Sequence, residues 1–346
     1  MPGRFIKEGK QMSERVKVGV IGVGHLGQTH ARLLRQIGTV ELVGVFDTDR
    51  SRSEAISTEL SVKSFDSLDE LSKSVDAVSI VAPTSYHCEL AAYFLNSGKH
   101  CFIEKPITTT VEEAEKICRL AEDRKLKVQV GHVERFNPAV LALSQLKLEP
   151  MFIESHRLAQ FKPRGIDVAV VLDLMVHDID LILHFVKSPV ASVDASGVGV
   201  ISDTVDIANA RVKFENGAVA NLTSSRISQR QMRKMRLFQR DAYISIDFAD
   251  GIAEVYRAAK SDGSAISGIS LGTIGVGDSA RVVTYEQPEA PQVNSIKMEL
   301  ELFAKSIIDD TPTVVGPEEA LKVMAVADTI VKQIEESKRI LNFQVR

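Results

Sequence analysis

The stretch Val16-Lys17-Val18-Gly19-Val20-Ile21-Gly22-Val23-Gly24-His25-Leu26-Gly27-Gln28 decides the fold of the first half of the chain. It reads as a short apolar strand that runs directly into a G-x-G-x-x-G motif. Gly22 allows a tight turn off the strand, Gly24 lets the backbone approach a pyrophosphate, and Gly27 lets the next helix pack close to the sheet. The motif therefore predicts a dinucleotide-binding turn between a strand and a helix.

The helix that follows the glycines is expected over residues 25–37, with Gly38 just past its end. The free backbone amides of its first residues, His25 and Leu26, would hold the phosphates of a dinucleotide. A chance cluster of turn glycines is the simpler alternative, and it does not account for a strand and a helix on either side of the motif.

An acidic residue stands at the distance that such a site requires. The next strand, expected at 41–46, ends at Asp47, about 20 residues after the last glycine, where a carboxylate would bind the ribose 2′-hydroxyl. Because Asp47 would repel a 2′-phosphate, we expect NAD as the cofactor rather than NADP. Arg50 and Arg52 lie just beyond it and leave NADP open.

Length and composition place the chain among globular two-domain proteins. It has 346 residues, 44% of them hydrophobic and 25% charged. The formal net charge of −4 gives no overall attraction to nucleic acid or to an anionic membrane, and no apolar run approaches the roughly 20 residues of a membrane span. We therefore expect neither kind of partner.

The N-terminus and the cysteines indicate a cytoplasmic protein. Residues 1–14 are polar and lack the apolar segment of a secretory signal, so we expect a disordered tail there. The three cysteines have no C-x-x-C spacing and are expected to be free thiols. The eight histidines are scattered without a metal-binding pattern.

Residues 15–131 alternate helices and strands, which predicts an α/β Rossmann domain with a doubly wound parallel sheet. Further strands are expected at 62–65, 76–82, 100–103 and 127–130, with helices between them. Ligands of such sheets bind beyond the carboxyl ends of the strands. The loops at those ends should therefore bring five more residues to the cofactor: Pro83, Thr84, His87, Glu104 and Lys105.

Residues 132–346 change to a strand-rich pattern, which predicts an α+β domain for substrate binding and oligomerisation. Its large, mainly antiparallel open sheet should contain strands at 151–161, 193–200, 206–214, 218–227 and 235–248. Residues 215–217 read as a hairpin turn and residues 261–277 as a mobile loop. Helices are expected at 167–186, 297–308 and 318–335, the last two closing this domain.

Two patterns could carry chemistry. Lys105 ends a core strand immediately before a proline, which restricts its backbone; an ammonium aimed at the cofactor would stabilise an alkoxide. Asp173 and His177 are four residues apart on the expected helix, so the carboxylate could hold the imidazole as a general base. A surface lysine and a solvated helix face are the alternatives.

The same helix face continues through Asp180 and His184, which makes a metal site conceivable. No second group of ligands supports it, so we predict no metal. A third feature is the run from Arg226 to Arg240, which holds several cations and no acid. It reads either as a solvated face or as a subsite for a phosphorylated substrate or a subunit contact.

The three motifs together, Gly22-x-Gly24-x-x-Gly27, Glu104-Lys105-Pro106 and Asp173-x-x-x-His177, resemble the Gfo/Idh/MocA family of dehydrogenases. The resemblance implies that Lys105 and His177 flank the nicotinamide and that Asp173 contacts the substrate. It also implies an open sheet that is often buried in a homodimer or homotetramer. Met175 departs from the family, which often has glycine there, and this affects the shape of the pocket.

The segment 131–138 resembles the branch of this family that oxidises nucleotide-linked sugars such as UDP-N-acetylglucosamine. Glu134, Arg135 and Asn137 would then bind the sugar or its phosphates; a charged linker in which Asn137 starts a helix is the alternative. Arg157, Lys162 and Arg164 precede the catalytic helix. They are further candidates for substrate phosphate contacts.

The sequence thus predicts an NAD-dependent dehydrogenase that oxidises a secondary hydroxyl of a sugar, with His177 as base and Lys105 stabilising the oxyanion. Two alternatives remain open: a dehydrogenase of a free sugar, inositol or other cyclic polyol, and a non-enzymatic NAD(P)-sensing regulator on the same fold.

Overall fold

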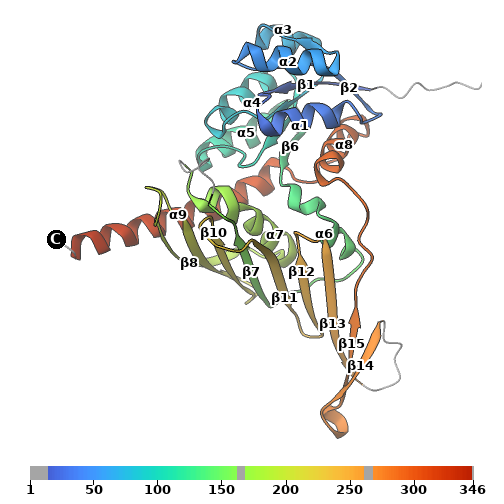
Figure 1. Cartoon of the computed structure of the whole chain (residues 1–346), viewed down its shortest axis with the longest axis vertical. Helices are drawn as coiled ribbons and strands as arrows, with labels where there is room; N and C mark the ends of the chain where they lie inside the picture. The colour runs from blue at the N-terminus through green and yellow to red at the C-terminus, as the bar shows by residue number, and fades with distance from the viewer. Residues whose placement is uncertain (1–14, 162–167, 261–267, 345–346) are drawn as a thin grey trace, which may run out of the picture.

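The computed structural model describes residues 15–161, 168–260 and 268–344. It contains two sheets, which Figure 1 shows one above the other, with the N-terminal sheet uppermost. The expected tail at 1–14 and the candidate phosphate ligands Lys162 and Arg164 lie outside the described residues.

The N-terminal sheet has six parallel strands in the order β3-β2-β1-β4-β5-β6. Helices connect the strands, so the central ones are covered on both faces and consist of buried apolar residues such as Val20 and Ile103. The predicted doubly wound sheet is confirmed. Its strands are β1 (Val16–Ile21), β2 (Val40–Phe46), β3 (Lys63–Ser64), β4 (Ala77–Ile80), β5 (His100–Glu104) and β6 (Val128–Gly131). Its helices are α1 (His25–Leu34), α2 (Arg50–Leu60), α3 (Leu68–Ser74), α4 (His87–Asn96) and α5 (Val111–Arg124).

Capping residues fix where several of these helices begin and end. The Thr110 side chain and the Glu113 side chain form a reciprocal capping box at the start of α5, as predicted. The predicted end of α1 was wrong. The helix stops at Leu34 rather than at residue 37, and the chain then turns so that Ile37 packs into the core; Gly38 is therefore not its cap.

The second sheet has nine strands in the order β14-β15-β13-β12-β11-β7-β10-β9-β8. It is mainly antiparallel, as predicted, with β7 and β10 as a parallel pair. The hairpin turn at Gly217, whose φ is +87°, joins β9 to β10. The strands are β7 (Phe152–Leu158), β8 (Val190–Val198), β9 (Ile207–Phe214), β10 (Val219–Ser225), β11 (Met232–Phe238), β12 (Ala242–Asp247), β13 (Ile252–Lys260), β14 (Ile269–Ile274) and β15 (Arg281–Glu286).

Several predictions for this sheet were wrong. The single strand expected at 235–248 is two strands, β11 and β12, joined by a turn at Arg240. The expected mobile loop at 261–277 contains β14, and the remaining part, 261–267, lies outside the described residues. The sequence interpretation also missed β13 and β15.

The remaining helices hold the two halves together. Helix α7 (Val176–Val186) packs on one face of the second sheet, and α6 (Pro138–Ala142) lies beside β12 and β13. Helix α8 (Ser295–Ile308) returns to the first half, where Leu300 and Phe303 join the core around β1. Helix α9 (Pro317–Gln344) contacts α5 as well as α7 and β8, so it spans both halves (Figure 1).

Among the described helices, none combines the length with the apolar character that crossing a bilayer requires.

Candidate active site

The glycine loop between β1 and α1 is closed on the protein side and open on the other. Gly22 has a φ of +83°, and a Cβ there would lie 2.7 Å from the carbonyl oxygen of Val81. A Cβ on Gly27 would lie only 1.8 Å from the carbonyl oxygen of Gly22, whereas one on Gly24 would meet nothing within 4 Å. Each glycine therefore has the property that a dinucleotide turn needs, and the space above Gly24 fits a pyrophosphate.

A cleft of about 600 Å³ opens beside this loop. The Asp47 carboxylate is fixed at its edge, because it accepts hydrogen bonds from the amides of Val23 at 2.7 Å and Asp49 at 2.8 Å. The two arginines that left NADP open are held by carboxylates: Arg50 pairs with Glu54 and Asp66, and Arg52 with Asp49. The cleft is lined by Ile21, Gly22, Gly24, Phe46, Asp47, Thr48, Arg52, Leu68, Val81, Ala82, Pro83, Tyr86, Glu89 and Leu90.

Lys105 reaches from the end of β5 to the second half of the chain. Its Nζ donates to the carbonyl oxygen of Asp173 at 2.8 Å and lies 3.8 Å from the Asp173 carboxylate. Burial lowers the pKa of Lys105, and the charges of Asp173 and Glu104 oppose this shift. Glu104 itself faces the interior, where its carboxylate lies 3.2 Å from Nε2 of His30. The lysine is therefore held at the junction of the two halves.

The side chains of Asp173 and His177 do not form the contact that their spacing predicted. Asp173 lies in a π-helical turn, Val171–Met175, and His177 in the α-helix that follows. The wide turn breaks the α-helical periodicity on which the four-residue spacing relied. Among the described residues the Asp173 carboxylate makes no hydrogen bond to His177, and it lies beside Lys105 instead. The expectation that Asp173 holds the imidazole was wrong.

His177 is neutral at neutral pH for another reason. Burial lowers its pKa well below the ordinary 6.5, and the charges of Lys105, Arg157 and Arg233 lower it further. Its Nδ1 is buried and has no hydrogen-bond partner among the described residues. A neutral imidazole beside a lysine ammonium can accept a proton while the ammonium stabilises a negative oxygen.

Residues 16–132 match the model of an oxidoreductase family with an NAD-binding Rossmann fold, and residues 154–245 match the GFO/IDH/MocA C-terminal domain. A UDP-N-acetylglucosamine 3-dehydrogenase of Acidithiobacillus ferrooxidans is 41% identical over 255 residues, which are 73% of this chain and 81% of the relative. The chain belongs to the Gfo/Idh/MocA family of oxidoreductases.

Two solved structures resemble the chain along nearly its whole length. The Acidithiobacillus ferrooxidans enzyme superposes with a TM-score of 0.83 at 35% identity, covering 93% of this chain and 98% of that one. A scyllo-inositol dehydrogenase of Lactobacillus casei, with NAD(H) and scyllo-inositol bound, has a TM-score of 0.73 at 21% identity over 94% and 98% of the two chains. It shares the fold. The family model and the 41%-identical relative confirm the predictions of a dehydrogenase and of NAD as its cofactor.

Within this Gfo/Idh/MocA chain, His87 lies below the cofactor rim rather than in the cleft. Its ring is buried, with Nδ1 2.9 Å from the carbonyl oxygen of Pro106 and Nε2 2.8 Å from that of Ala82. His87 therefore joins the loop after β4 to the loop that carries Lys105. Thr84 opens the short 3₁₀ turn Thr84–Tyr86 in front of it.

The predicted sugar ligands after β6 are buried in contacts with the protein itself. Arg135 binds both carboxylate oxygens of Asp180, at 2.7 and 2.8 Å, and also contacts Nδ1 of His184 at 2.7 Å. These contacts account for the second half of the polar stripe on α7. Among the described residues no group of side chains has the arrangement of a metal site.

Arg157 on β7 has the same kind of environment. Its guanidinium binds Asp178 at 2.9 and 3.0 Å and Glu134 at 2.7 Å. Asn137 donates to Glu134 at 3.0 Å, and its side-chain oxygen caps α6 by accepting the Ala139 amide at 3.1 Å. These buried charges tie β6, β7 and α7 together. The residue types of Glu134, Asn137 and Arg157 suggested a substrate site. Their contacts with each other and with Asp178, which come from distant parts of the chain, show that they join these elements.

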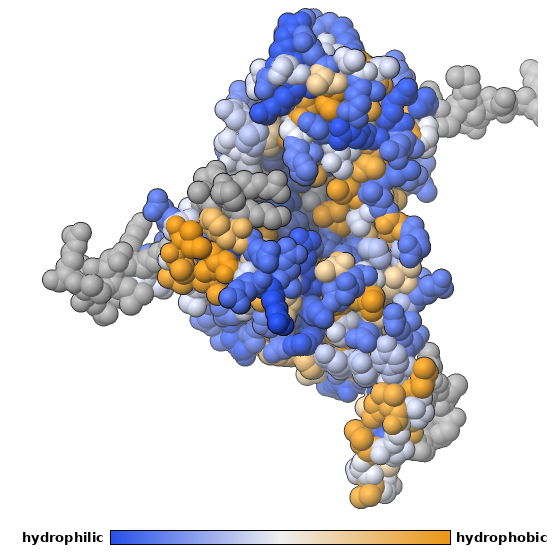
Figure 2. Space-filling model, in the orientation of Figure 1, coloured by the Kyte–Doolittle hydropathy of each residue, from blue (hydrophilic) through white to orange (hydrophobic). Residues whose placement is uncertain are grey.

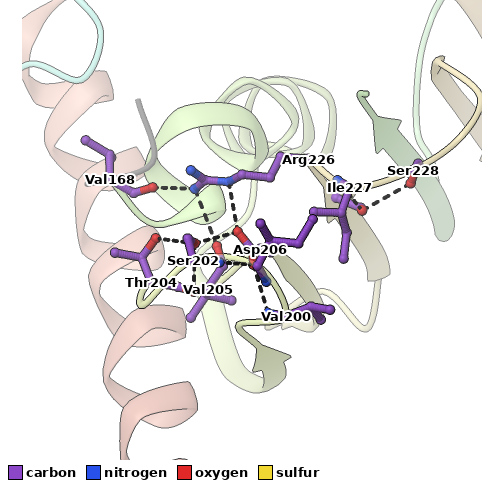
Figure 3. Close-up of polar contacts among 11 residues, drawn as sticks. Val168, Val200, Ser202, Thr204, Val205, Asp206, Arg226, Ile227 and Ser228 are labelled. Atoms are coloured by element: carbon purple, nitrogen blue, oxygen red, sulfur yellow. Dashed lines mark hydrogen bonds and ion pairs between the residues drawn. The ribbon is translucent and has the colours of Figure 1, made fainter. Parts of the chain in front are cut away.

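The cations of the run from Arg226 to Arg240 fall into different environments. Arg226 is buried against Asp206, with 3.8 Å between Nε and Oδ1, and its guanidinium donates to the carbonyl oxygen of Val168 (Figure 3). Three consecutive amides, those of Val200, Ile201 and Ser202, also donate to Asp206. Burial alone would raise the pKa of Asp206, but these hydrogen bonds outweigh it and lower the pKa. Arg226 therefore anchors the chain just before the catalytic segment.

Proposed function

We propose that this enzyme oxidises a secondary hydroxyl of a nucleotide-linked sugar such as UDP-N-acetylglucosamine. The observation that carries the proposal is that Lys105 of the cofactor domain donates to the Asp173 carbonyl of the second domain, and that its charge acts on the buried, neutral His177 four residues further on. The similarity to a UDP-N-acetylglucosamine 3-dehydrogenase, along 81% of that relative, supports the choice of substrate.

The roles of the residues follow from their charges. NAD, when bound, supplies the acceptor for a hydride. His177 takes the proton of the substrate hydroxyl, because its lowered pKa keeps it neutral. The Lys105 ammonium, held by the Asp173 carbonyl, stabilises the negative charge that develops on the oxygen. The half-exposed Asp173 carboxylate can then accept a hydrogen bond from a neighbouring hydroxyl.

The cofactor would be held by the residues around the cleft. The amides after Gly24, including those of His25 and Leu26, would bind the pyrophosphate, and Asp47 would bind the adenosine ribose. Pro83 lines the cleft, and Thr84, which follows it in the short turn, would also contact the cofactor.

The alternative substrate is a free cyclic polyol. Scyllo-inositol 2-dehydrogenase (NAD(+)) of Bacillus subtilis is 28% identical over 63% of this chain and 69% of that enzyme. NADH formation with UDP-N-acetylglucosamine and with scyllo-inositol, each with NAD, separates the two candidates. Turnover with the UDP-sugar supports the proposal, and turnover with inositol alone would replace it. Turnover with neither, although NAD binds, would contradict the assigned substrate class.

We also propose that the enzyme is a cytoplasmic homo-oligomer that associates through the second sheet. The face of this sheet opposite α7 carries a row of aromatic side chains from five strands, with ring centroids 5.1 to 5.8 Å apart. Strand β14 adds exposed apolar residues at one end of the sheet (Figures 1 and 2). The three cysteines are free thiols, which supports the proposed cytoplasmic location. The aromatic row consists of Phe152, Phe238, Tyr243, Tyr256 and Tyr285.

Light scattering tests the association. Tyr256→Lys places a charge in the middle of the row and should lower the mass to that of one chain. Val314→Lys changes an exposed apolar residue outside the sheet and should leave the mass unchanged. A wild-type protein of single-chain mass would refute the proposed oligomer.

A further inference from the structure

Strand β11 divides the basic run between the two faces of the second sheet. Met235 and Leu237 are fully buried in the core under α7. Lys234 and Arg236 point to the opposite face, where they pair with Asp247 at 2.9 Å and Glu154 at 3.5 Å. Because side chains alternate along a strand, Arg233 lies on the same face as Met235. It is thus on the side of the sheet that carries the catalytic helix.

The register of the sheet places Arg233 at the end of that face next to the active site. Arg233 is directly opposite Arg157 on β7. The Arg157 guanidinium binds Asp178, which follows His177 in the sequence. Arg233 is exposed, and its charge is among those that lower the pKa of His177. Three independent features, the alternation, the register and the charge effect, therefore agree on its position.

Arg233 differs from the other cations of the site in having no partner for its guanidinium among the residues that the structure describes. Lys105 is held by Asp173, Arg135 by Asp180, and Arg157 by two carboxylates. Within the described part of the chain, no carboxylate or hydrogen-bond acceptor contacts the Arg233 guanidinium. An exposed cation beside a general base leaves a positive charge for an anionic ligand to neutralise.

We propose that Arg233 binds the diphosphate group of the substrate, an assignment that rests on the proposed nucleotide-sugar dehydrogenase function. A guanidinium can bind phosphate oxygens with two parallel N–H bonds, which fixes orientation as well as supplying affinity. The sugar of a nucleotide sugar is attached directly to its diphosphate. An anchor beside His177 therefore places the sugar ring at the base and the nucleoside farther out. Free polyols lack a phosphate group for the Arg233 guanidinium to bind.

The test compares Arg233→Met with Arg240→Met. Both variants remove an exposed arginine of the same run, but Arg240 lies at the far end of β11. Affinities for UDP and for uridine are measured by calorimetry on the enzyme saturated with NAD, which keeps UDP out of the cofactor's own phosphate site. Loss of a charge-assisted hydrogen-bonded pair should weaken UDP binding about 10- to 100-fold in Arg233→Met and leave uridine and NAD binding unchanged. Arg240→Met should behave as wild type.

Kinetics with UDP-N-acetylglucosamine supply the second readout. Arg233→Met should raise KM by a similar factor, and Arg233→Lys should recover part of the loss because it restores the charge without the paired N–H groups. Equal UDP affinities in Arg233→Met and Arg240→Met would overturn the proposal while leaving the dehydrogenase function intact. A wild-type enzyme that binds no UDP and oxidises only inositol would refute the proposed substrate, and the anchor with it.

Discussion

Gly27→Ala tests the glycine loop through a clash that the structure defines. The new Cβ would lie 1.8 Å from the carbonyl oxygen of Gly22, and such contacts normally exceed 3 Å. The loop or α1 must therefore shift by about 1 Å. Gly22 is itself closely packed on the other side, since a Cβ on it would lie 2.7 Å from the carbonyl oxygen of Val81.

The shift should act directly on NAD affinity. A displacement of about 1 Å takes a backbone amide out of hydrogen-bonding range of a phosphate oxygen, and a hydrogen bond to a charged group contributes about 1.5–3 kcal/mol. We expect NAD binding to weaken about 10- to 100-fold, measured by titration with NADH fluorescence or by calorimetry. The melting temperature of the NAD-free protein should also fall.

Two glycines provide controls for this variant. Gly24→Ala has no protein atom within 4 Å of its Cβ, so it should keep wild-type stability and still weaken NAD binding, since its methyl group occupies the space for the pyrophosphate. Gly38→Ala has equally open surroundings away from the cleft and should change neither quantity. Unchanged NAD affinity in Gly27→Ala, or a loss in Gly38→Ala as large as in Gly24→Ala, would refute this reasoning.

Two further predictions concern charge. As pH rises, turnover should increase with a midpoint well below 6.5, where His177 becomes the neutral base, and should decrease again with a midpoint below 10.5, where Lys105 loses its proton. A pH profile of kcat measures both limbs, and an acidic midpoint above 6.5 would contradict the assignment. Arg157→Met leaves the buried Asp178 unpaired and should cost about 3–5 kcal/mol of unfolding free energy in urea. The exposed Arg211→Met should cost under about 0.5 kcal/mol. Unchanged stability with a raised KM would instead make Arg157 a substrate ligand.

The sequence predicted the cofactor half well because its signals are local. The glycines of the first turn, the capping box at Thr110 and the alternation of strands with helices each depend on residues close together in the chain. The second half was harder. The turn at Arg240 has no glycine or proline to mark it, so β11 and β12 read as one strand.

The site shows the same limit more sharply. Arg135 and Arg157 have the chemistry of phosphate ligands, but the carboxylates that bind them, Asp180 and Asp178, are on a helix far along the chain. Nothing in the local sequence marks the π-helical turn in which Asp173 lies, just before the α-helix that carries His177. In the sequence, Arg233 is one of several cations between residues 226 and 240. Only the pairing of β11 with β7 shows that it lies on the face of the sheet that carries His177.

Lys105 and His177 are proposed to carry out the chemistry on a nucleotide-linked sugar. NADH formation from UDP-N-acetylglucosamine, measured for Lys105→Ala and His177→Ala together with their NAD affinity, tests both roles. We predict that both variants bind NAD within about threefold of wild type, and that each loses about 10²- to 10⁴-fold in turnover, the usual contribution of a positioned acid or base. Turnover retained by both variants would contradict the claim.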